Sequence, residues 1–242
     1  MQYQVISPVT DVHGAPDKDA LRGKFETQLV FGEIFIVQEK KDGWCKGVCA
    51  HDDYPGYVES LHLTQSVTAA THIVTAARSH AYRDANIKSP PVSTLSFGSL
   101  INMTASHQGF AQIDDDVWIY ERHIAECGVP DTDHVATAKK FLETPYYWGG
   151  RSGFGIDCSG LVQISLARAK IAVPRDAEMQ EKAIGQPVDT PRSGDFVFFQ
   201  GHVGIMADDD NIIHANAFHM KVTIEPLKLV AARSKITSIR RL

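Results

Sequence analysis

The sequence predicts an α+β protein in which two small all-β barrels precede a domain that combines helices with an antiparallel sheet. The first half of the 242 residues consists of short β-rich runs separated by Gly, Pro, Asn and Asp, with almost no helical periodicity. A set of residues in this half recurs at a constant spacing, which indicates a duplicated module. Helical stripes begin only after the turn that starts at Gly128. We therefore expect domains at 1–66, 67–127 and 128–242.

The duplicated module is visible in four residues of the first barrel and their counterparts in the second. At an offset of 66, the residues Leu29, Phe31, Gly32 and Trp44 recur as Leu95, Phe97, Gly98 and Phe110. Further along, the offset falls to 61, because the dipeptide at 62–63 aligns with the one at 123–124. The first copy therefore holds about five extra residues, which fall around 50–56.

The extra residues fall within the segment Ala50-His-Asp-Asp-Tyr-Pro-Gly56 and make Tyr54 a candidate binding residue. Loops tolerate insertion better than packed strands do, and function is often added in them. The same segment, with Asp52 and Asp53 before Pro and Gly, is also typical of a plain surface turn. Turn chemistry alone leaves both interpretations open.

The third domain is predicted to begin with two helices. The first helix follows the turn cluster at 128–133, is capped by Asp131 or Asp133, and carries apolar residues at Val135, Ala138, Phe141 and Leu142. The second helix starts near Cys158, with a buried face formed by Leu161, Val162, Ser165, Leu166 and Ala169. Short strands are expected beyond Pro174, at 196–199, 203–206 and 211–214.

Two histidines flank the turn that we predict between the last two of these strands. His202 and His214 are equidistant from Asp208, and residues equidistant from the centre of an antiparallel hairpin face one another. We therefore expect both imidazoles on the same side of the hairpin as close neighbours. His219 has no such register and is the fallback to His214.

Cys158 is the candidate nucleophile because it starts a helix. Unpaired backbone N–H groups and the helix dipole favour an anion there, so we expect a lowered thiol pKa. The flanking Gly153, Gly155 and Gly160 are expected to let the backbone approach a substrate, and the Cys158 N–H to help hold an oxyanion. His202 is then the predicted base and His214 the group that orients it.

The other three cysteines are predicted to be structural. On one straight strand, Cys45 and Cys49 would lie about 13 Å apart, too far for a disulfide. Their spacing with His51 matches no common zinc pattern, so we predict neither a metal nor any other cofactor. Cys127 has no neighbouring base. Only Cys158 is placed for chemistry.

Composition narrows the partners and the compartment. A net charge of -5 and a pI near 6.1 lack the basic excess that nucleic-acid binding requires, and small or neutral substrates fit better. No apolar stretch is long enough to span a membrane. The N-terminal residues 1–8 show neither a basic start nor an apolar run, which predicts the cytoplasm, or a secreted or periplasmic protein if a leader was removed.

Four segments of the third domain resemble the NlpC-type cell-wall peptidases, a papain-like family. They are Tyr147-Trp-Gly-Gly-Arg-Ser-Gly-Phe-Gly-Ile-Asp-Cys-Ser-Gly-Leu-Val-Gln163, Gly194-Asp-Phe-Val-Phe-Phe199, Gly201-His-Val-Gly-Ile205 and Ile213-His-Ala215. The resemblance covers residues 130–242 and implies that Cys158 is the nucleophile, His202 the base and His214 the orienting residue. These are the roles that the residues predict by themselves.

The two β-rich repeats resemble bacterial SH3-like domains, and the combination resembles γ-D-glutamyl-L-diamino acid endopeptidases. That subgroup acts on peptidoglycan stem peptides with a free N-terminal L-Ala, and a loop of its first SH3-like domain reaches the active site. The resemblance implies that the substrate amine is held by Tyr54, Asp157, Ser159 and Asp176. Arg175 and Trp148 complete the predicted substrate-binding set, and Asp176 is alternatively a helix cap or an ion-pair partner of Arg175.

Three functions fit this pattern. The first is an endopeptidase that releases L-Ala-γ-D-Glu from stem peptides, which the Asp-Tyr-Pro-Gly loop and the pair at 175–176 favour. The second is an amidase that cuts between muramic acid and L-Ala with the same catalytic set. The third is a wall-binding protein without catalysis, for which the set of Cys158, His202 and His214 would be unnecessary. The sequence leaves open the diamino acid, the oligomeric state and the origin of the wall.

Overall fold

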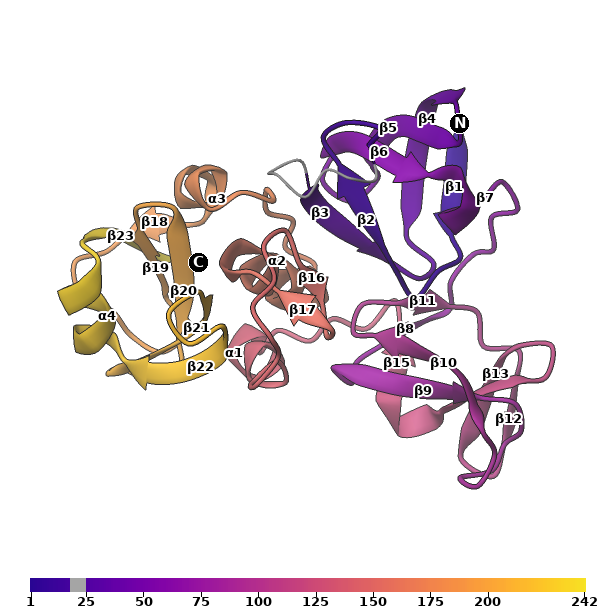
Figure 1. The fold of residues 1–242 in the computed structure, drawn as a ribbon. Coiled ribbons are helices and arrows are strands. Elements are labelled where there is room, and N and C mark those ends of the chain that lie inside the picture. Colours follow the sequence, from indigo (N-terminus) through magenta and orange to yellow (C-terminus); the bar gives the residue numbers. More distant parts are fainter. Residues whose placement is uncertain (18–24) are drawn as a thin grey trace. The chain divides into compact units, whose positions relative to one another are not determined.

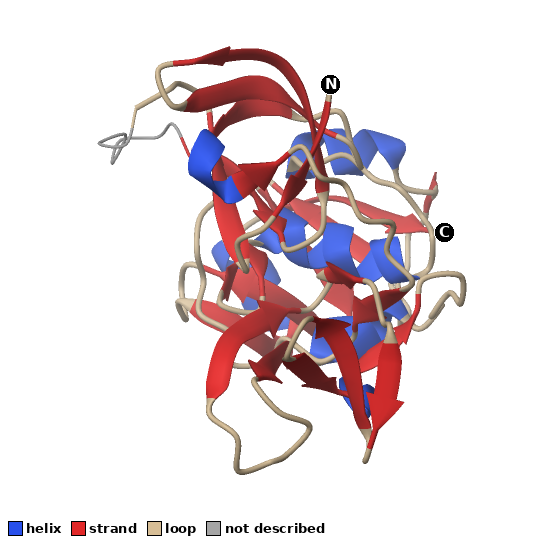
Figure 2. Ribbon diagram, turned by 90° about the vertical axis from the view of Figure 1, so that its right-hand side faces the viewer, coloured by secondary structure: helices blue, strands red, loops and turns tan. Residues whose placement is uncertain are grey.

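The structure, a computed structural model, describes residues 1–17 and 25–242 and divides into two compact units. The first unit consists of Met1–Val129 with Ser152–Phe154, and the second of Pro130–Arg151 with Gly155–Leu242. In the described part of the chain, every α-helix lies in the second unit, whereas the first is built of strands and two short 3-10 helices (Figures 1 and 2). The mixed α and β architecture is therefore confirmed.

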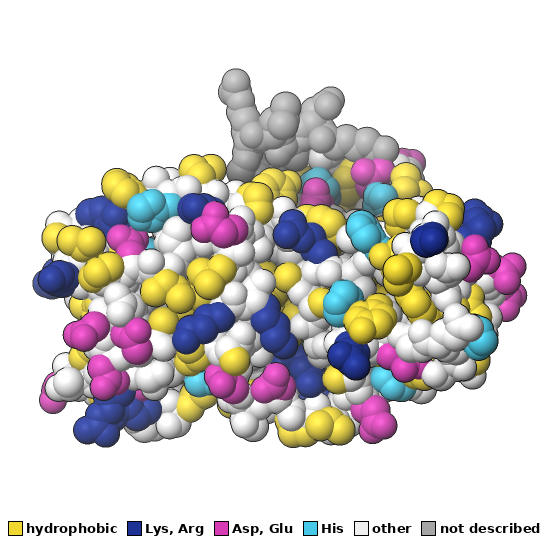
Figure 3. Space-filling view, turned by 90° about the horizontal axis from the view of Figure 1, so that it is seen from below, with side chains coloured by type: hydrophobic (Ala, Val, Ile, Leu, Met, Phe, Trp, Pro, Cys, Tyr) yellow, Lys and Arg dark blue, Asp and Glu magenta, His cyan; other side chains and the backbone are white. Residues whose placement is uncertain are grey.

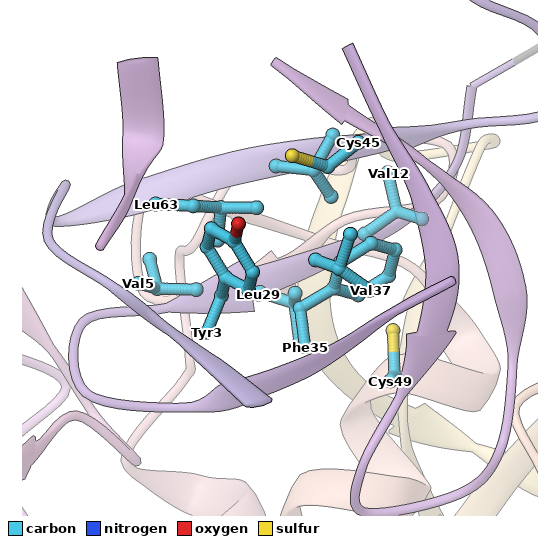
Figure 4. Close-up of a cluster of buried hydrophobic side chains, with 10 residues drawn as sticks. Tyr3, Val5, Val12, Leu29, Phe35, Val37, Cys45, Cys49 and Leu63 are labelled. Atoms are coloured by element: carbon cyan, nitrogen blue, oxygen red, sulfur yellow. The ribbon is translucent and has the colours of Figure 1, made fainter. Parts of the chain in front are cut away.

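The N-terminal half of the first unit is one antiparallel sheet with the strand order β3-β2-β6-β5-β4-β1-β7 (Figure 1). Its elements are β1 (Gln2–Val5), β2 (Val9–His13), β3 (Phe25–Val30), β4 (Ile34–Lys41), β5 (Trp44–Cys49), β6 (Pro55–Glu59), η1 (Ser60–His62) and β7 (Leu63–Thr64). Alternate side chains point inward, as in β2, because successive residues of a strand face opposite sides. Figure 4 shows Val12, Leu29 and Phe35 among the buried residues that form this core.

The C-terminal half of the first unit repeats this strand order. Its elements are β8 (His72–Val74), β9 (Arg78–Tyr82), β10 (Pro91–Ser96), β11 (Leu100–Ile101), β12 (Ala105–His107), β13 (Phe110–Asp114), β14 (Val117–Tyr120), η2 (Glu121–His123) and β15 (Ile124–Glu126). They form the orders β10-β9-β14-β13-β12 and β11-β8-β15, in which β11 and β12 together take the place of β4. Each strand therefore has the same neighbours in both copies, as the duplication at an offset of 66 predicts. That the second copy is SH3-like stays a prediction.

The extra residues of the first copy lie between β5 and β6. Five residues join these strands at 50–54, whereas only Asp115 and Asp116 join β13 to β14. Within the longer loop, Asp53 adopts a positive φ of 58° and the Asp52 carboxylate accepts a hydrogen bond from the Tyr54 backbone N–H, at 3.1 Å. Both are features of a tight turn. Tyr54 itself is partly buried against the core of its own barrel.

The predicted structural role of Cys45 and Cys49 is confirmed. Both side chains are fully buried on β5 within the barrel core, and all four cysteines are free thiols. Their burial explains the residue type, since a free cysteine behaves as a small apolar side chain.

The second unit contains an antiparallel sheet with helices packed against it (Figure 1). Its helices are α1 (His134–Lys139), α2 (Cys158–Arg168), α3 (Ala177–Ala183) and α4 (Leu227–Arg233), and its strands are β16 (Arg151–Ser152), β17 (Gly155–Ile156), β18 (Gln186–Pro187), β19 (Phe196–Phe199), β20 (His202–Met206), β21 (Asn211–Asn216), β22 (Lys221–Pro226) and β23 (Ile236–Arg241). The main sheet has the order β18-β23-β19-β20-β21-β22 and is antiparallel throughout.

The helices cover both faces of this sheet. On one face, Val197 and Phe199 of β19 join a buried cluster with Val230 of α4. The alternate residue Phe196 points to the other face and stacks on His134 of α1, with ring centroids 5.3 Å apart. Helix α2 packs against β20 and β21 and is buried along nearly its whole length. Its first residue, Cys158, is therefore held by the core.

The predicted starts of α1 and α2 are confirmed, whereas α1 ends earlier than predicted. The side chain of Asp133, one of the two expected caps, accepts a hydrogen bond from the backbone N–H of Ala136 in α1, at 2.8 Å. That helix ends at Lys139, earlier than the apolar pattern indicates, and Phe141 is buried from the turn that follows. Asp157 caps α2.

The surface carries no single dominant charge on the face drawn in Figure 3, where basic and acidic side chains are interspersed. Among the helices at 1–17 and 25–242, none has both the length and the apolar character needed to cross a membrane.

Candidate active site

Cys158 lies at the N-terminus of α2, as predicted, with its side chain almost fully buried. The sulfur accepts hydrogen bonds from the backbone N–H groups of Val203 and Ser159. Burial and, second, the negative charge of Asp157 raise the pKa of the thiol to about 11, and these backbone hydrogen bonds offset them only in part. The expected lowering of the thiol pKa by the helix terminus is therefore wrong for the resting site, because burial outweighs it.

His202 and His214 are direct neighbours on the sheet. Nε2 of His202 lies 2.8 Å from Nδ1 of His214, and the two rings meet edge to face. Burial, together with the neighbouring charge of His214, lowers the pKa of His202 to about 3. Burial also lowers the pKa of His214, although the Glu225 carboxylate opposes this. Both rings are neutral at pH 7.

The register of this hairpin differs from the predicted one. Ile205 pairs with Ile213, so His214 lies opposite Gly204 and diagonally across from His202. The turn is centred one residue later than expected, because the Asp208 carboxylate accepts hydrogen bonds from the backbone N–H groups that follow, at residues 210 and 211. A shift of one residue in the centre moves each partner by two positions, which leaves both histidines on the same face.

Glu225 extends the histidine pair and was not anticipated from the sequence. Its Oε1 lies 3.0 Å from Nε2 of His214 and 3.3 Å from Nε2 of His219. The fallback residue His219 therefore contacts the carboxylate rather than His202. Glu225 lies on β22, where its direct partner on β21 is Ile212. The only signal in the sequence was an acidic residue within a short strand after the His214 strand.

Tyr146 is a second site residue that sequence reasoning missed. Burial and, next, the charges of Cys158 and Asp157 raise the pKa of its hydroxyl to about 12, so the phenol remains a hydrogen-bond donor at neutral pH. Its backbone N–H donates a hydrogen bond to the carbonyl oxygen of Met220, and its backbone forms an isolated parallel β-bridge with Ile156. The residue precedes the motif that identified Cys158 by a single position, and no periodicity marked it.

Asp157, Ser159 and Arg175 form one hydrogen-bonded group beside the nucleophile. The Arg175 guanidinium is 2% exposed and binds both oxygens of Asp157, at 3.0 and 2.7 Å, and the Ser159 hydroxyl, at 2.8 Å. Asp157 also accepts from the backbone N–H groups of Gly149 and Gly160. The carboxylate thus caps α2 and neutralises Arg175 at the same time.

The remaining predicted substrate residues have different environments. Asp176 is exposed and occupies the N-cap position of α3 without a side-chain capping bond. Trp148 is 66% exposed. Tyr54 belongs to the first unit and is described there. For all three, the substrate contact stays a prediction.

The glycines around Cys158 serve packing. A Cβ atom on Gly160 would lie 2.4 Å from the carbonyl oxygen of Gly150, and one on Gly155 would lie 2.7 Å from Cβ of Tyr147. A Cβ atom on Gly153, which belongs to the first unit, would lie 2.0 Å from the carbonyl oxygen of Ala77. Close packing of protein atoms therefore accounts for these glycines, and the expectation that they let the backbone approach a substrate stays a prediction.

The structure brings His202, His214 and Glu225 into one hydrogen-bonded chain and holds the Cys158 sulfur against Val203, the residue that follows His202. A hydrogen bond from the thiol to either imidazole is not among the contacts of the described residues. A buried cysteine at a helix N-terminus, next to the strand of a paired histidine, points to a hydrolase of the cysteine peptidase type.

Comparison with known proteins specifies the class further. Residues 143–241 match the NlpC/P60 family, and residues 15–63 match the bacterial dipeptidyl-peptidase SH3 domain. The chain is thus a cysteine peptidase with an NlpC/P60 domain and a bacterial SH3 domain.

Three similar proteins cover most of the chain. A γ-D-glutamyl-L-lysine dipeptidyl-peptidase of Bacillus subtilis is 26% identical over 89% of this chain and 80% of its own length. A protein of the same name from Bacillus cereus is 28% identical over 90% of this chain and 75% of its own length. The crystal structure of an NlpC/P60 family protein from Bacillus cereus superimposes with a TM-score of 0.84 at 22% identity, over 100% of this chain and 99% of that one, which shows the shared fold.

Proposed function

We propose that the protein hydrolyses the bond between γ-D-glutamate and the L-diamino acid of peptidoglycan stem peptides that have a free N-terminal L-Ala, and releases L-Ala-γ-D-Glu. The observation that carries this proposal is the site around Cys158, with its sulfur beside the strand of the His202–His214 pair. The names of the two relatives that match about nine-tenths of this chain, γ-D-glutamyl-L-lysine dipeptidyl-peptidases, support the bond and the dipeptide product.

The proposed reaction starts from a neutral thiol and a neutral imidazole. His202 takes the proton of Cys158 as the sulfur attacks the γ-carbonyl carbon, and the resulting oxyanion is held by the Cys158 backbone N–H and the Tyr146 hydroxyl. The imidazolium then returns the proton to the amine of the leaving diamino acid as the C–N bond breaks. Water hydrolyses the thioester with His202 as base, and the thiol is regenerated.

The charges near the nucleophile bear on recognition of the substrate amine. Arg175 neutralises the Asp157 carboxylate, so this ion pair offers an ammonium little net attraction. The exposed Asp176 follows Arg175 directly and brings a second carboxylate near the guanidinium, so the three groups together carry one net negative charge. We propose that Asp176 provides most of the attraction, with Ser159, Asp157 and Tyr54 as hydrogen-bonding partners.

The Tyr54 contact is the most specific part of the substrate proposal. Tyr54→Phe removes one hydroxyl and is expected to raise KM for free-amine peptides roughly 10-fold, in line with the loss of one hydrogen bond to a charged group, while the melting temperature stays unchanged. Tyr57→Phe, on β6 of the same barrel, is the matched control. If both variants have the kinetics of the wild type, Tyr54 does not contact the substrate and the 50–54 loop is a plain turn.

One assay tests the function itself. The purified full chain is incubated with L-Ala-γ-D-Glu-diaminopimelate, with the same peptide acetylated at its amine, and with muropeptides that carry muramic acid, and the products are identified by mass spectrometry. Release of L-Ala-γ-D-Glu from the free peptide alone is the expected result. Absence of cleavage by a folded preparation contradicts the proposal, and a freed sugar from the muropeptide identifies an amidase instead.

We further propose that the C-terminal half of the first unit is also SH3-like. Its strands have the same neighbours as those of the N-terminal half, which contains the matched SH3 domain. In addition, β5 and β13 begin with the aromatic residues Trp44 and Phe110, at the offset of 66. An experimental structure in which the two copies superimpose strand by strand would support this assignment.

A further inference from the structure

The histidine pair ends in a carboxylate that the reaction proposed above does not use. Glu225 is mostly buried, with a side chain 10% exposed, and its Oε1 accepts a hydrogen bond from Nε2 of His214, at 3.0 Å. Hydrogen bonds from Arg233 and His214 outweigh the effect of burial and keep the pKa of Glu225 below its ordinary value. The group is therefore an ionised carboxylate, which accepts hydrogen bonds and donates none.

The donors and acceptors along this chain follow from that single fact. Because Glu225 only accepts, Nε2 of His214 must carry the proton. A neutral imidazole has one N–H, so Nδ1 of His214 is the acceptor in its bond with His202. Nε2 of His202 is then the donor of that 2.8 Å bond. The unprotonated nitrogen of His202 is Nδ1.

We infer that Glu225 is a positioning residue that fixes the tautomers of His214 and His202 and so leaves Nδ1 of His202 as the basic nitrogen. The tautomers follow from the hydrogen bonds alone, whereas their effect on catalysis depends on the proposed peptidase function. Without an obligate acceptor at His214, both rings could reverse their protons together. His202 would then carry its proton on Nδ1 and could not accept one there.

Two donors hold one oxygen of this carboxylate in place. Nε2 of His214 and the guanidinium of Arg233 contact Oε1 of Glu225, and Nε2 of His219 lies 3.3 Å from the same oxygen. Arg233 is in turn stacked on the ring of Phe218, 4.2 Å from its centroid. Since both donors converge on one oxygen, a glutamine amide could present its own oxygen to the same donors. Glu225→Gln should therefore preserve the tautomers, whereas Glu225→Ala should release them.

The test measures the tautomers directly. The full chain is labelled with ¹⁵N-histidine, and the ring signals of His202 and His214 are assigned from single His→Gln variants at pH 7. The wild type and Glu225→Gln are expected to show both rings protonated at Nε2 alone. In Glu225→Ala, the protonated and unprotonated nitrogen signals of both rings should shift toward each other, as in a mixture of tautomers.

Kinetics on the free stem peptide give the second readout. Glu225→Ala should lose roughly 10- to 100-fold in kcat with little change in KM, as expected when a general base is disordered, and Glu225→Gln should recover most of this loss. Glu143→Gln is the matched control, because Glu143 forms an exposed ion pair with Lys221, also on β22, without touching either histidine. It should behave as the wild type.

The outcomes separate this inference from the function. If the rings of Glu225→Ala keep the wild-type tautomers, or if wild-type Nδ1 of His202 is protonated, the inference is overturned even when the enzyme is active. If Glu225→Ala does not fold, Glu225→Met replaces it, because it keeps most of the side-chain volume and removes the acceptor: a mixture of tautomers supports the role of the carboxylate, and wild-type tautomers oppose it. A wild type with the expected tautomers and no peptidase activity contradicts the proposed function alone.

Discussion

At the scale of single residues, Cys158 shows how burial decides a chemical state. The helix terminus and two backbone hydrogen bonds favour a thiolate, yet burial and the charge of Asp157 raise its pKa to about 11. The position of the nucleophile was predictable from a cysteine at a helix start, because that placement depends on local sequence. Its ionisation was not, since burial depends on strands that are 40 residues further along the chain.

This ionisation gives a testable pH profile. A thiol with a raised pKa is mostly protonated at neutral pH, so its alkylation by iodoacetamide should become faster with each pH unit up to about 10. A thiolate–imidazolium pair would instead give a plateau from about pH 5 upward. Following Cys158 by peptide mass spectrometry, with the exposed part of Cys127 as internal reference, distinguishes the two.

A second prediction at this scale concerns Asp176. Replacing Asp176 by Asn keeps its size and removes its charge, and should raise KM for the free-amine peptide roughly 10- to 100-fold, which is the expected loss of a charge-assisted hydrogen bond. The acetylated peptide should be unaffected. Asp189→Asn, an exposed carboxylate before β19, is the control. Equal KM values for the two variants would remove Asp176 from the substrate site.

At the scale of elements, helix α2 and its cap place the nucleophile. Asp157 binds the Gly160 N–H at 2.7 Å and Arg175 at the same time, so one carboxylate fixes the helix end and the ion pair. The sequence was sufficient for the start of α2, whereas the cap by Asp157 was not predicted. It was insufficient for the hairpin register, since the bonds of Asp208 moved the turn centre by one residue. Glu225 was missed because its role depends on that pairing.

The packing of α2 predicts a sensitive position. Gly160→Ala would put a methyl group 2.4 Å from the carbonyl oxygen of Gly150, which cannot be accommodated without moving the helix or the loop. We expect a loss of about 1 to 3 kcal/mol in unfolding free energy, typical of overpacking, and lower activity because Cys158 moves with the helix. Gly128→Ala, with no atom within 4 Å, is the control. Urea unfolding and kcat would measure both, and equal stabilities would contradict this account.

At the scale of the whole molecule, the buried histidines link stability to pH. His202 has a pKa of about 3 in the folded protein, against an ordinary value of 6.5. Between these values, the unfolded chain binds a proton that the folded chain does not bind. The contribution of His202 to stability is therefore complete above about pH 6.5 and is lost progressively as the pH falls toward 3. His214 adds to the loss, since its pKa is also lowered.

Urea unfolding of the full chain at pH 7.5, 6 and 5 tests this linkage. The free energy of unfolding should fall with pH in the wild type and less steeply in His202→Gln, which has no titrating group at this position. His107→Gln, an exposed histidine on β12, should keep the wild-type slope. Parallel slopes for all three proteins would contradict the buried neutral state of His202.

The duplicated β module has a consequence for redesign of the chain. One copy joins its β5 and β6 strands with five residues that include Tyr54, and the other spans the equivalent gap with two aspartates. The second copy keeps the same strand neighbours with the shorter connection. This strand arrangement therefore does not need the longer connection, and the residues at 50–54 can be replaced to bind other ligands while the strands beneath them persist.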